Sequence, residues 1–224
     1  MIEALFPPGV AAAELRLPGD AALLDPAEAL VVARAVPKRV GEFAAGRLCA
    51  RSALARFGIE RFALRAGADR RPLWPEGLVG SITHTAGFCA AVVGPGTRFA
   101  ALGLDTEKAH ALRPALWQRI CLAPEIDWIE SLPRAAQVCA ATLIFSAKEA
   151  LYKCQYPYTG ERLSFHDVQV EPLDWGTDRG HFKIFASNPS ARFAGFARAL
   201  RAAYRFHEGF ISTGVALSAG EAAR

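Results

Sequence analysis

Apolar positions recur at helical spacing in the first quarter of the chain, over residues 26–57. Pro26 suits the first turn of one helix, and the spacing predicts a second helix from about Pro37 to Phe57, with Gly58 as its stop signal. Cationic side chains interleave with the apolar ones in this second helix: Arg39, Arg47 and Arg51. Such arginines fit either a solvated helix face or a binding face.

The pattern changes after this helical region. Residues 69–85 are rich in Pro and Gly, and predict a structured loop that leads into a short strand. Residues 88–94 and 98–105 are apolar runs separated by Pro-Gly-Thr, and predict a β-hairpin. Helical spacing returns at 114–130 and 134–155, with Ser-Leu-Pro between the two segments.

Beyond Pro157 the chain returns to strand-like patterns. Strands are predicted at 165–172, 180–187 and 204–217, with a helix around 191–203. The order helix, hairpin, helices, strands predicts an α+β fold with antiparallel sheets. We expect two lobes, residues 1–105 and 106–224. The absence of βαβ alternation, of GxGxxG and of a P-loop motif disfavours the common nucleotide-binding folds.

Composition narrows the class of protein. The 224 residues are 52% hydrophobic and 21% charged, as in an ordinary globular protein. The net charge of +4 and the scattered aromatic residues do not favour a nucleic-acid partner. The five Cys form no CxxC pair, and four of them lie among apolar neighbours, which predicts small core residues of a reduced, cytoplasmic protein. The start lacks a basic leader, and the apolar stretch 87–104 is too interrupted to span a membrane, so we expect no membrane partner.

Three acids are the first candidates for chemistry. Asp105 and Glu107 directly follow an apolar strand and, being two residues apart, point to one face at about 6.5–7 Å spacing. Glu149 lies on the predicted helix 134–155, flanked by Lys148 and Lys153. Alone, Glu149 and Lys153 suggest a surface ion pair contributing about 0.3–0.5 kcal/mol. Combined with the strand acids, they suggest three carboxylates for Mg²⁺ and two lysines for a phosphate substrate.

A polar loop adds further candidate ligands. Ser81, Thr83 and His84 lie within the segment Ser-Ile-Thr-His-Thr, where hydroxyls and an imidazole could bind phosphate oxygens. A single His after a strand is more often structural, whereas a His beside Ser and Thr in a Gly-flanked loop favours a ligand site.

Four blocks in this order resemble the 4′-phosphopantetheinyl transferases, in particular the larger, monomeric bacterial class of the enterobactin-synthase-component type. They are residues 38–51, "RPLWPEGLVGSITHT" (71–85), "LGLDTE" (102–107) and "FSAKEALYK" (145–153). The resemblance covers residues 38–153. Phe145 stands where some relatives have Trp, and "ITH" stands where the family often has "ISH".

The resemblance implies a fold of two pseudo-symmetric α+β lobes with coenzyme A (CoA) in the cleft between them. It implies that Mg²⁺ is held by Asp105, Glu107 and Glu149. It implies catalytic roles for Glu149, Lys153 and Asp105. The residues it assigns to CoA are Arg39, Arg47, Arg70, Arg71, Thr83, His84, Asp105, Lys148, Glu149 and Lys153, with the choice between Arg70 and Arg71 left open.

The resemblance also implies a reaction. A serine of an apo acyl or peptidyl carrier protein would attack the β-phosphorus of CoA and release 3′,5′-ADP, with Glu149 as base. Residues 113–135, near Trp117 and Trp128, are the expected docking surface for the carrier. The alternatives are a CoA-binding module without catalysis, a Mg²⁺-dependent nuclease or phosphatase, and a scaffold with surface ion pairs.

Overall fold

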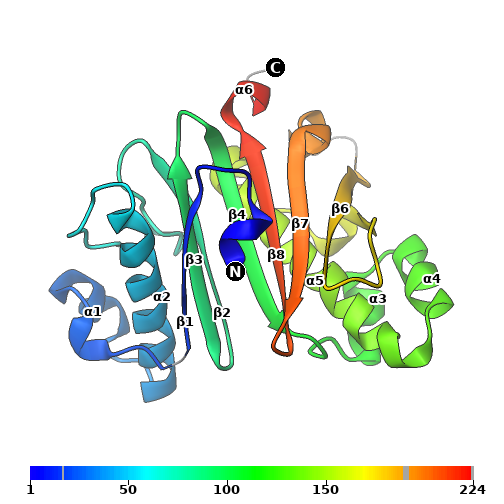
Figure 1. Ribbon diagram of the computed structural model, residues 1–224, viewed down its shortest axis with the longest axis horizontal. Helices are drawn as coiled ribbons and strands as arrows, with labels where there is room; N and C mark the ends of the chain where they lie inside the picture. The colour runs from blue at the N-terminus through cyan, green and yellow to red at the C-terminus, as the bar shows by residue number, and fades with distance from the viewer. Residues whose placement is uncertain (17, 189–191, 223–224) are drawn as a thin grey trace.

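The chain forms two antiparallel sheets that lie side by side, as the computed structural model in Figure 1 shows for residues 1–16, 18–188 and 192–222. The first sheet has the order β1-β3-β2, with bounds Ala11–Leu15, Phe88–Pro95 and Leu78–Thr85. The second has the order β4-β8-β7-β6-β5, with bounds Phe99–Lys108, Phe210–Ser218, Leu200–His207, Arg179–Ala186 and Val168–Pro172. The predicted α+β class with antiparallel sheets is confirmed.

Each sheet is covered by one long helix. Helix α2 (Pro37–Ala55) packs on β1 and β3, and helix α5 (Arg134–Thr159) packs on β4 and β8. The shorter helices are α1 (Pro26–Val32), α3 (Trp117–Ile120), α4 (Ala123–Ser131) and α6 (Ala219–Ala222). Both long helices were predicted, and α5 continues four residues past the predicted end to an αL cap at Gly160.

The predicted hairpin of 88–94 with 98–105 is wrong. β3 pairs with β1 and β2, so the hairpin is β2–β3, whereas β4 crosses into the other sheet and pairs with β8. Both strands are almost wholly buried, and each has its main partner in its own sheet. A local turn signal cannot reveal a pairing between β4 and a strand that lies a hundred residues further along the chain.

The last third of the chain holds further differences. The predicted helix at 191–203 is wrong: short 3-10 turns at Arg192–Gly195 and Ala197–Ala199 lead directly into β7, and Ala191 lies outside the described residues. The predicted strand 204–217 is two strands joined by a turn with positive φ at Glu208 and Gly209. The helical segment 114–130 is divided into a 3-10 turn, α3 and α4, and a proline lies in the first turn of two of these three pieces.

The two sheets meet at β2 and β4 through side chains, which we call the hydroxyl seam. Ser81 Oγ accepts from the main-chain N–H of Leu104 at 3.0 Å, and Thr83 Oγ1 accepts from that of Thr106 at 2.9 Å. Buried N–H groups need a partner, and on this edge of β4 the hydroxyls supply it. The seam therefore fixes β4, and the acids at its end, against β2.

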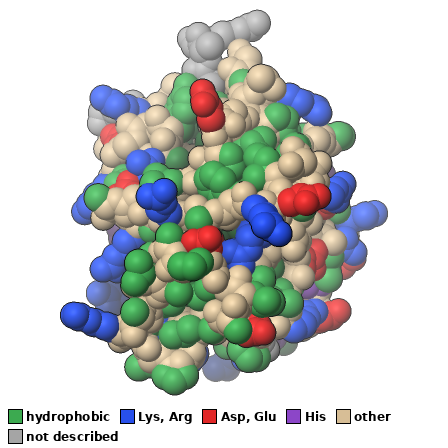
Figure 2. Space-filling model, turned by 90° about the vertical axis from the view of Figure 1, so that its left-hand side faces the viewer, with side chains coloured by type: hydrophobic (Ala, Val, Ile, Leu, Met, Phe, Trp, Pro, Cys, Tyr) green, Lys and Arg blue, Asp and Glu red, His purple; other side chains and the backbone are tan. Residues whose placement is uncertain are grey.

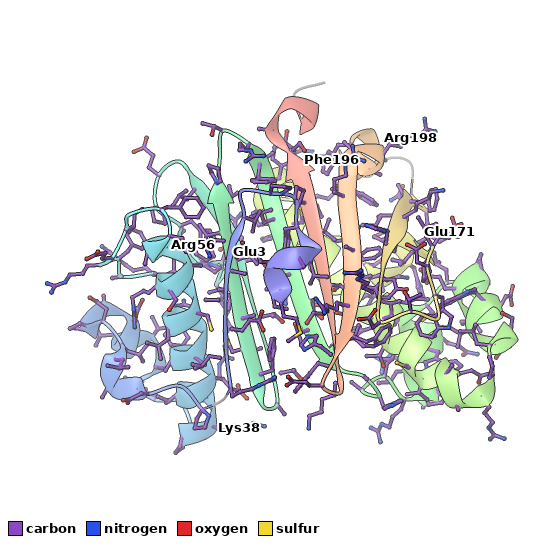
Figure 3. The ribbon with its side chains drawn as sticks, in the orientation of Figure 1. Glu3, Lys38, Arg56, Glu171, Phe196 and Arg198 are labelled. Atoms are coloured by element: carbon purple, nitrogen blue, oxygen red, sulfur yellow. The ribbon has the colours of Figure 1, made fainter. Side chains whose placement is uncertain are left out.

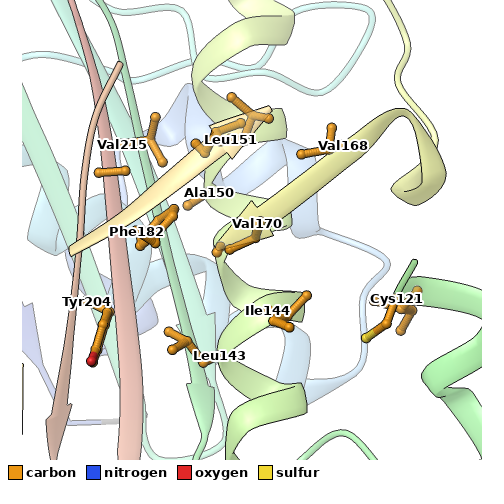
Figure 4. Packing of buried hydrophobic residues seen from close by; sticks show 14 of the residues in the cluster. Cys121, Leu143, Ile144, Ala150, Leu151, Val168, Val170, Phe182, Tyr204 and Val215 are labelled. Atoms are coloured by element: carbon orange, nitrogen blue, oxygen red, sulfur yellow. The ribbon is translucent and has the colours of Figure 1, made fainter. Parts of the chain in front are cut away.

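Helix α5 lies directly on β4 because of one glycine. A Cβ on Gly103 would lie 1.9 Å from the carbonyl oxygen of Ala150 and 2.8 Å from Cys154 Cβ. Only a residue without a side chain allows this approach. The largest core cluster fills the space between α5 and the second sheet, and Figure 4 shows Leu143, Ile144, Phe182 and Tyr204 among its members.

The N-terminal turn Ile2–Leu5 covers the joint between the halves. In Figure 3 Glu3 and Arg56 face each other, and Arg56 Nη1 lies 3.3 Å from Glu3 Oε2. The lobe division expected at 105/106 falls inside β4, and the division into lobes of residues 1–105 and 106–224 stays a prediction.

Figure 2 shows how charged side chains are distributed on one face of the molecule. Figure 2 looks onto the side carrying α1 and α2, where Lys and Arg side chains are spread out rather than gathered in one stripe. Among the described residues, no helix is both long enough and apolar enough to cross a membrane. Four cysteines are buried as predicted: Cys49, Cys89, Cys121 and Cys154.

Candidate active site

The centre of the site is an ion pair between β4 and α5. Lys153 Nζ lies 2.7 Å from Asp105 Oδ1 and also donates to the carbonyl oxygen of Leu104 at 3.2 Å. Ser146 Oγ donates to the other carboxylate oxygen of Asp105 at 2.8 Å, and contacts Thr213 Oγ1 at the same distance. Asp105 is 4% exposed, so this carboxylate is fixed by its partners rather than by water.

The other two acids lie in the electrostatic field of Asp105. Burial first, and then the nearby Asp105 carboxylate, raise the pKa of Glu107 to about 7. Burial and Asp105 also raise the pKa of Glu149 above its usual range. The cationic Lys153 opposes both shifts. The three predicted acids are thus brought into one neighbourhood with an excess of negative charge.

The donor chemistry of these acids fits a hard cation, because carboxylate oxygens are the ligands that Mg²⁺ prefers. A cation would relieve their mutual repulsion, which after burial is a cause of the raised pKa of Glu107. Within the described part of the chain, no group of three or more His, Cys, Asp and Glu is arranged to hold a metal ion. The magnesium ligand set stays a prediction.

A cationic group lies on the β2 side of the seam. Arg39 Nη1 and His84 Nε2 are 3.2 Å apart, and Glu42 lies 3.6 Å from both. Burial and the Arg39 charge lower the pKa of His84. Lys153 lowers this pKa further, whereas Asp105 opposes the shift. Arg39 and His84 therefore lie together, facing the region of the acids.

A first cavity of about 700 Å³ opens between the two halves. Its walls are the loop 69–74, residues 78–82 of β2, residues 100–102 of β4 and the end of α5, including Lys153. Both predicted loop arginines, Arg70 and Arg71, line it. The Arg71 guanidinium lies 5.2 Å from the ring centre of Tyr156, which makes a cationic and aromatic surface suited to a nucleotide.

A second cavity of about 450 Å³ lies on the other side of Tyr152 and Arg162, which line both cavities. Glu149 lines the second cavity, whereas Lys153 lines the first. Leu151, Leu163, Phe165 and Val168 give the second cavity a mainly apolar wall. The acid and the lysine therefore sit at the junction of two different binding spaces.

The prediction that Lys148 binds phosphate is wrong for this arrangement. Its Nζ donates to Glu125 Oε2 at 2.7 Å, to Ile120 O at 2.8 Å and to Phe165 O at 2.9 Å. All three N–H groups are used, and the residue is 3% exposed. Adjacent residues of a helix point about 100° apart, so Lys148 faces α4 when Glu149 faces the site.

Two predicted nucleotide ligands are also buried in the fold. Arg47 is 7% exposed, donates from Nε to Leu64 O at 3.0 Å and lies over Phe43 at 4.0 Å. Thr83 is 1% exposed and belongs to the hydroxyl seam. Arg47 Nε and Thr83 Oγ1 already have partners inside the protein, and the assignment of these two residues to CoA stays a prediction.

Sequence reasoning missed several residues that complete the site. Ser146 and Tyr156 share the face of α5 that carries Glu149 and Lys153, at spacings of three and four. That spacing could have identified both. Arg162, by contrast, lies beyond the end of α5 and carries no signal in the local pattern.

Comparison with known proteins tests the resemblance directly. Residues 27–94 match the family model of the 4′-phosphopantetheinyl transferase N-terminal domain, and residues 101–205 match that of the 4′-phosphopantetheinyl transferase superfamily. The 4′-phosphopantetheinyl transferase Npt of Nocardia iowensis is 37% identical over 183 residues, covering 81% of this chain and 82% of that protein. The chain belongs to the 4′-phosphopantetheinyl transferase family.

Other members of the family match more partially. The 4′-phosphopantetheinyl transferase Svp of Streptomyces mobaraensis is 44% identical over 158 residues, covering 69% of this chain and 64% of Svp. Enterobactin synthase component D of Salmonella typhimurium is 40% identical over 121 residues, covering 52% of this chain and 48% of that protein. The predicted family is confirmed, and the predicted subgroup is among its relatives.

Proposed function

We propose that this protein transfers the 4′-phosphopantetheine group of CoA to a serine of an apo acyl or peptidyl carrier protein, and releases 3′,5′-ADP. Family membership supports the reaction class. One observation supports the site: Glu149 and Lys153 lie one helical turn apart at the junction of two cavities, with Asp105 paired to Lys153. The nucleotide end of CoA occupies the first cavity, so its phosphates reach this junction.

The residues around the junction have separate roles in this reaction. Arg71 and Tyr156 hold the nucleotide, Arg39 neutralises phosphate charge from the β2 side, and the neutral imidazole of His84 donates a hydrogen bond there. Glu149 accepts the proton of the attacking serine hydroxyl, which is a weak nucleophile without a base. The serine oxygen forms a bond to the β-phosphorus as the bond to the bridging oxygen breaks. Lys153 stabilises the charge that grows on the departing 3′,5′-ADP.

Magnesium is part of the proposal. Asp105, Glu107 and Glu149 would hold it. When bound, the ion neutralises the pyrophosphate and the three acids. The monomeric state and the cytoplasmic location expected from the sequence stay predictions.

The experiment is intact-mass spectrometry of apo carrier proteins incubated with this protein, CoA and Mg²⁺, with and without chelator. We expect the mass of one phosphopantetheine to be added to at least one carrier, and the addition to stop with chelator. CoA binding without transfer to any carrier in the panel would support the alternative, a CoA-binding module without catalysis. Transfer that continues with chelator would remove magnesium from the proposal.

A further inference from the structure

A buried ion pair links α5 to the outer wall of the second cavity. Lys148 reaches Glu125 on α4 at 2.7 Å, and both side chains are 1% exposed. The same ammonium group holds the main-chain oxygen of Phe165, whose ring lies 5.8 Å from that of Phe145. Phe165 belongs to residues 163–170, which we call the wall segment because five of its residues line the second cavity.

Glu125 holds the other end of the wall segment. Its Oε1 accepts from the main-chain N–H of Val170 at 2.7 Å, and its Oε2 accepts from that of Leu122, the cap of α4, at 2.7 Å. The pair therefore bonds one carbonyl and one amide of the wall segment. Lys148 directly precedes Glu149, so the pair sets where the wall lies relative to the proposed base.

The first half of the chain contains a similar ion pair, between Glu28 and Arg51. Glu28 is the third residue of α1 and accepts from its own cap, Asp25 N, at 3.0 Å. It also accepts from Leu64 N at 2.9 Å and pairs with Arg51 of α2 at 2.6 Å. In both halves a buried Glu at the start of a short helix joins a cation of the long helix to a distant main-chain amide.

The Glu28–Arg51 pair and the Glu125–Lys148 pair differ in whether they lie beside a cavity. Neither Glu28 nor Arg51 lines the two cavities described above, and Arg51 keeps 18% of its side chain exposed. Lys148 lines the second cavity next to Glu149. The first copy is therefore a natural control for the second, because it has the same construction without the same neighbour.

We propose that Lys148 and Glu125 are positioning residues, which hold the wall segment against Glu149 so that the transferred group is placed for attack. This rests on the proposed function. A buried ammonium with three acceptors is directional, and its removal leaves the Phe165 and Ile120 oxygens without a donor. A small shift of the wall is enough to slow the reaction, since misplacement by about 1 Å can cost a factor of about 100.

The test compares Lys148→Met with Arg51→Met. We measure kcat/KM for transfer, affinity for 3′,5′-ADP, and hydrogen exchange of the wall segment. For Lys148→Met we expect kcat/KM to fall by about ten-fold or more, 3′,5′-ADP affinity to be retained, and exchange to quicken in 163–170. For Arg51→Met we expect lower stability with kcat/KM and wall exchange kept.

A second variant guards against simple unfolding. Glu125→Leu with Lys148→Met removes both charges, a change that often leaves stability intact. We expect this double variant to fold, keep 3′,5′-ADP affinity and remain slow. Wild-type turnover in it, an equal loss in Arg51→Met, or loss of 3′,5′-ADP affinity would overturn the positioning role. If the wild-type protein shows no transfer, the proposed function fails. The positioning role is overturned separately if hydrogen exchange of the wall segment is no faster in Lys148→Met than in Arg51→Met.

Discussion

The two halves of the chain share one packing plan and present opposite charges to the joint between them. Each has a long helix on an antiparallel sheet and a buried Glu pinned by a cation of that helix. Towards the joint, the first half offers hydroxyls, Arg39 and His84, whereas the second offers three acids and Lys153. The first half adds Arg70 and Arg71 to the first cavity, whereas the second half supplies all three acids together with Lys153 and Arg162. The shared scaffold fixes geometry, and the difference in charge creates the site.

The largest effect should come from the second half. Replacing Glu149 with Gln removes the proposed base while keeping its shape, so single-turnover transfer should slow by about 10²–10⁴-fold. Binding of 3′,5′-ADP, measured by calorimetry, should persist because the first cavity is untouched. Glu60→Gln, an exposed change beyond the end of α2, is the control. A Glu149→Gln protein with nearly normal turnover would refute the assignment.

Gly103→Ala attacks the contact between α5 and β4. The new methyl group would overlap the Ala150 carbonyl and push α5, with Glu149, away from Asp105. We expect a loss of about 1–3 kcal/mol in the free energy of unfolding, with slower transfer. Gly195→Ala meets no atom within 4 Å and serves as control. Equal stability of both variants in urea denaturation would mean that the close approach is absent.

Arg71→Ala tests the nucleotide side of the comparison. Loss of a charge-assisted hydrogen bond of about 1.5–3 kcal/mol should weaken 3′,5′-ADP binding by roughly ten-fold or more. Arg70→Ala should do less, because only Arg71 is placed over Tyr156. Arg34, which is exposed and does not line the first cavity, gives the charge control. If Arg70→Ala has the larger effect in calorimetry, the roles of the two arginines are reversed.

The smallest effect concerns pH. Burial and Arg39 lower the folded pKa of His84, so below its ordinary value of 6.5 the unfolded chain binds the proton more readily. This contribution to stability is therefore present above pH 6.5 and lost on acidification. His84→Gln should lose less stability than wild type between pH 7.5 and pH 5.5, and the difference should be small because water reaches this side chain. Denaturation curves at both pH values decide it, with exposed His110→Gln expected to follow wild type.

The sequence was a good guide wherever one helix or one strand carried the information. The strand that carries Asp105 and the helix that carries Glu149 and Lys153 were predicted correctly, because hydrophobic spacing is a local property, whereas the roles of these residues stay predictions. Lys148 was assigned to the phosphates because it is next to Glu149 in the sequence. In the helix the two side chains point in different directions, and Lys148 pairs with Glu125 instead. The partner that neutralises Lys148, Glu125, lies 23 residues away, and no local pattern links the two.

The fold shows the same limit. Both long helices follow from hydrophobic spacing, but the partner of β4 does not. Thr83 looked like a ligand because a hydroxyl beside a His suits phosphate, whereas its actual partner is the amide of Thr106 on β4. Contacts between the halves depend on tertiary packing, which periodicity alone does not encode.

The hydroxyl seam also explains why there is a cleft at all. In an ordinary ladder β2 and β4 would lie about 4.8 Å apart, and the eight strands would close into one continuous sheet. Ser81 and Thr83 place the length of a side chain where a main-chain carbonyl would stand, and the first cavity opens along the same stretch of β2. The first cavity therefore lies where a continuous sheet would otherwise form, and the side chains of Ser81 and Thr83 keep the two edge strands β2 and β4 apart.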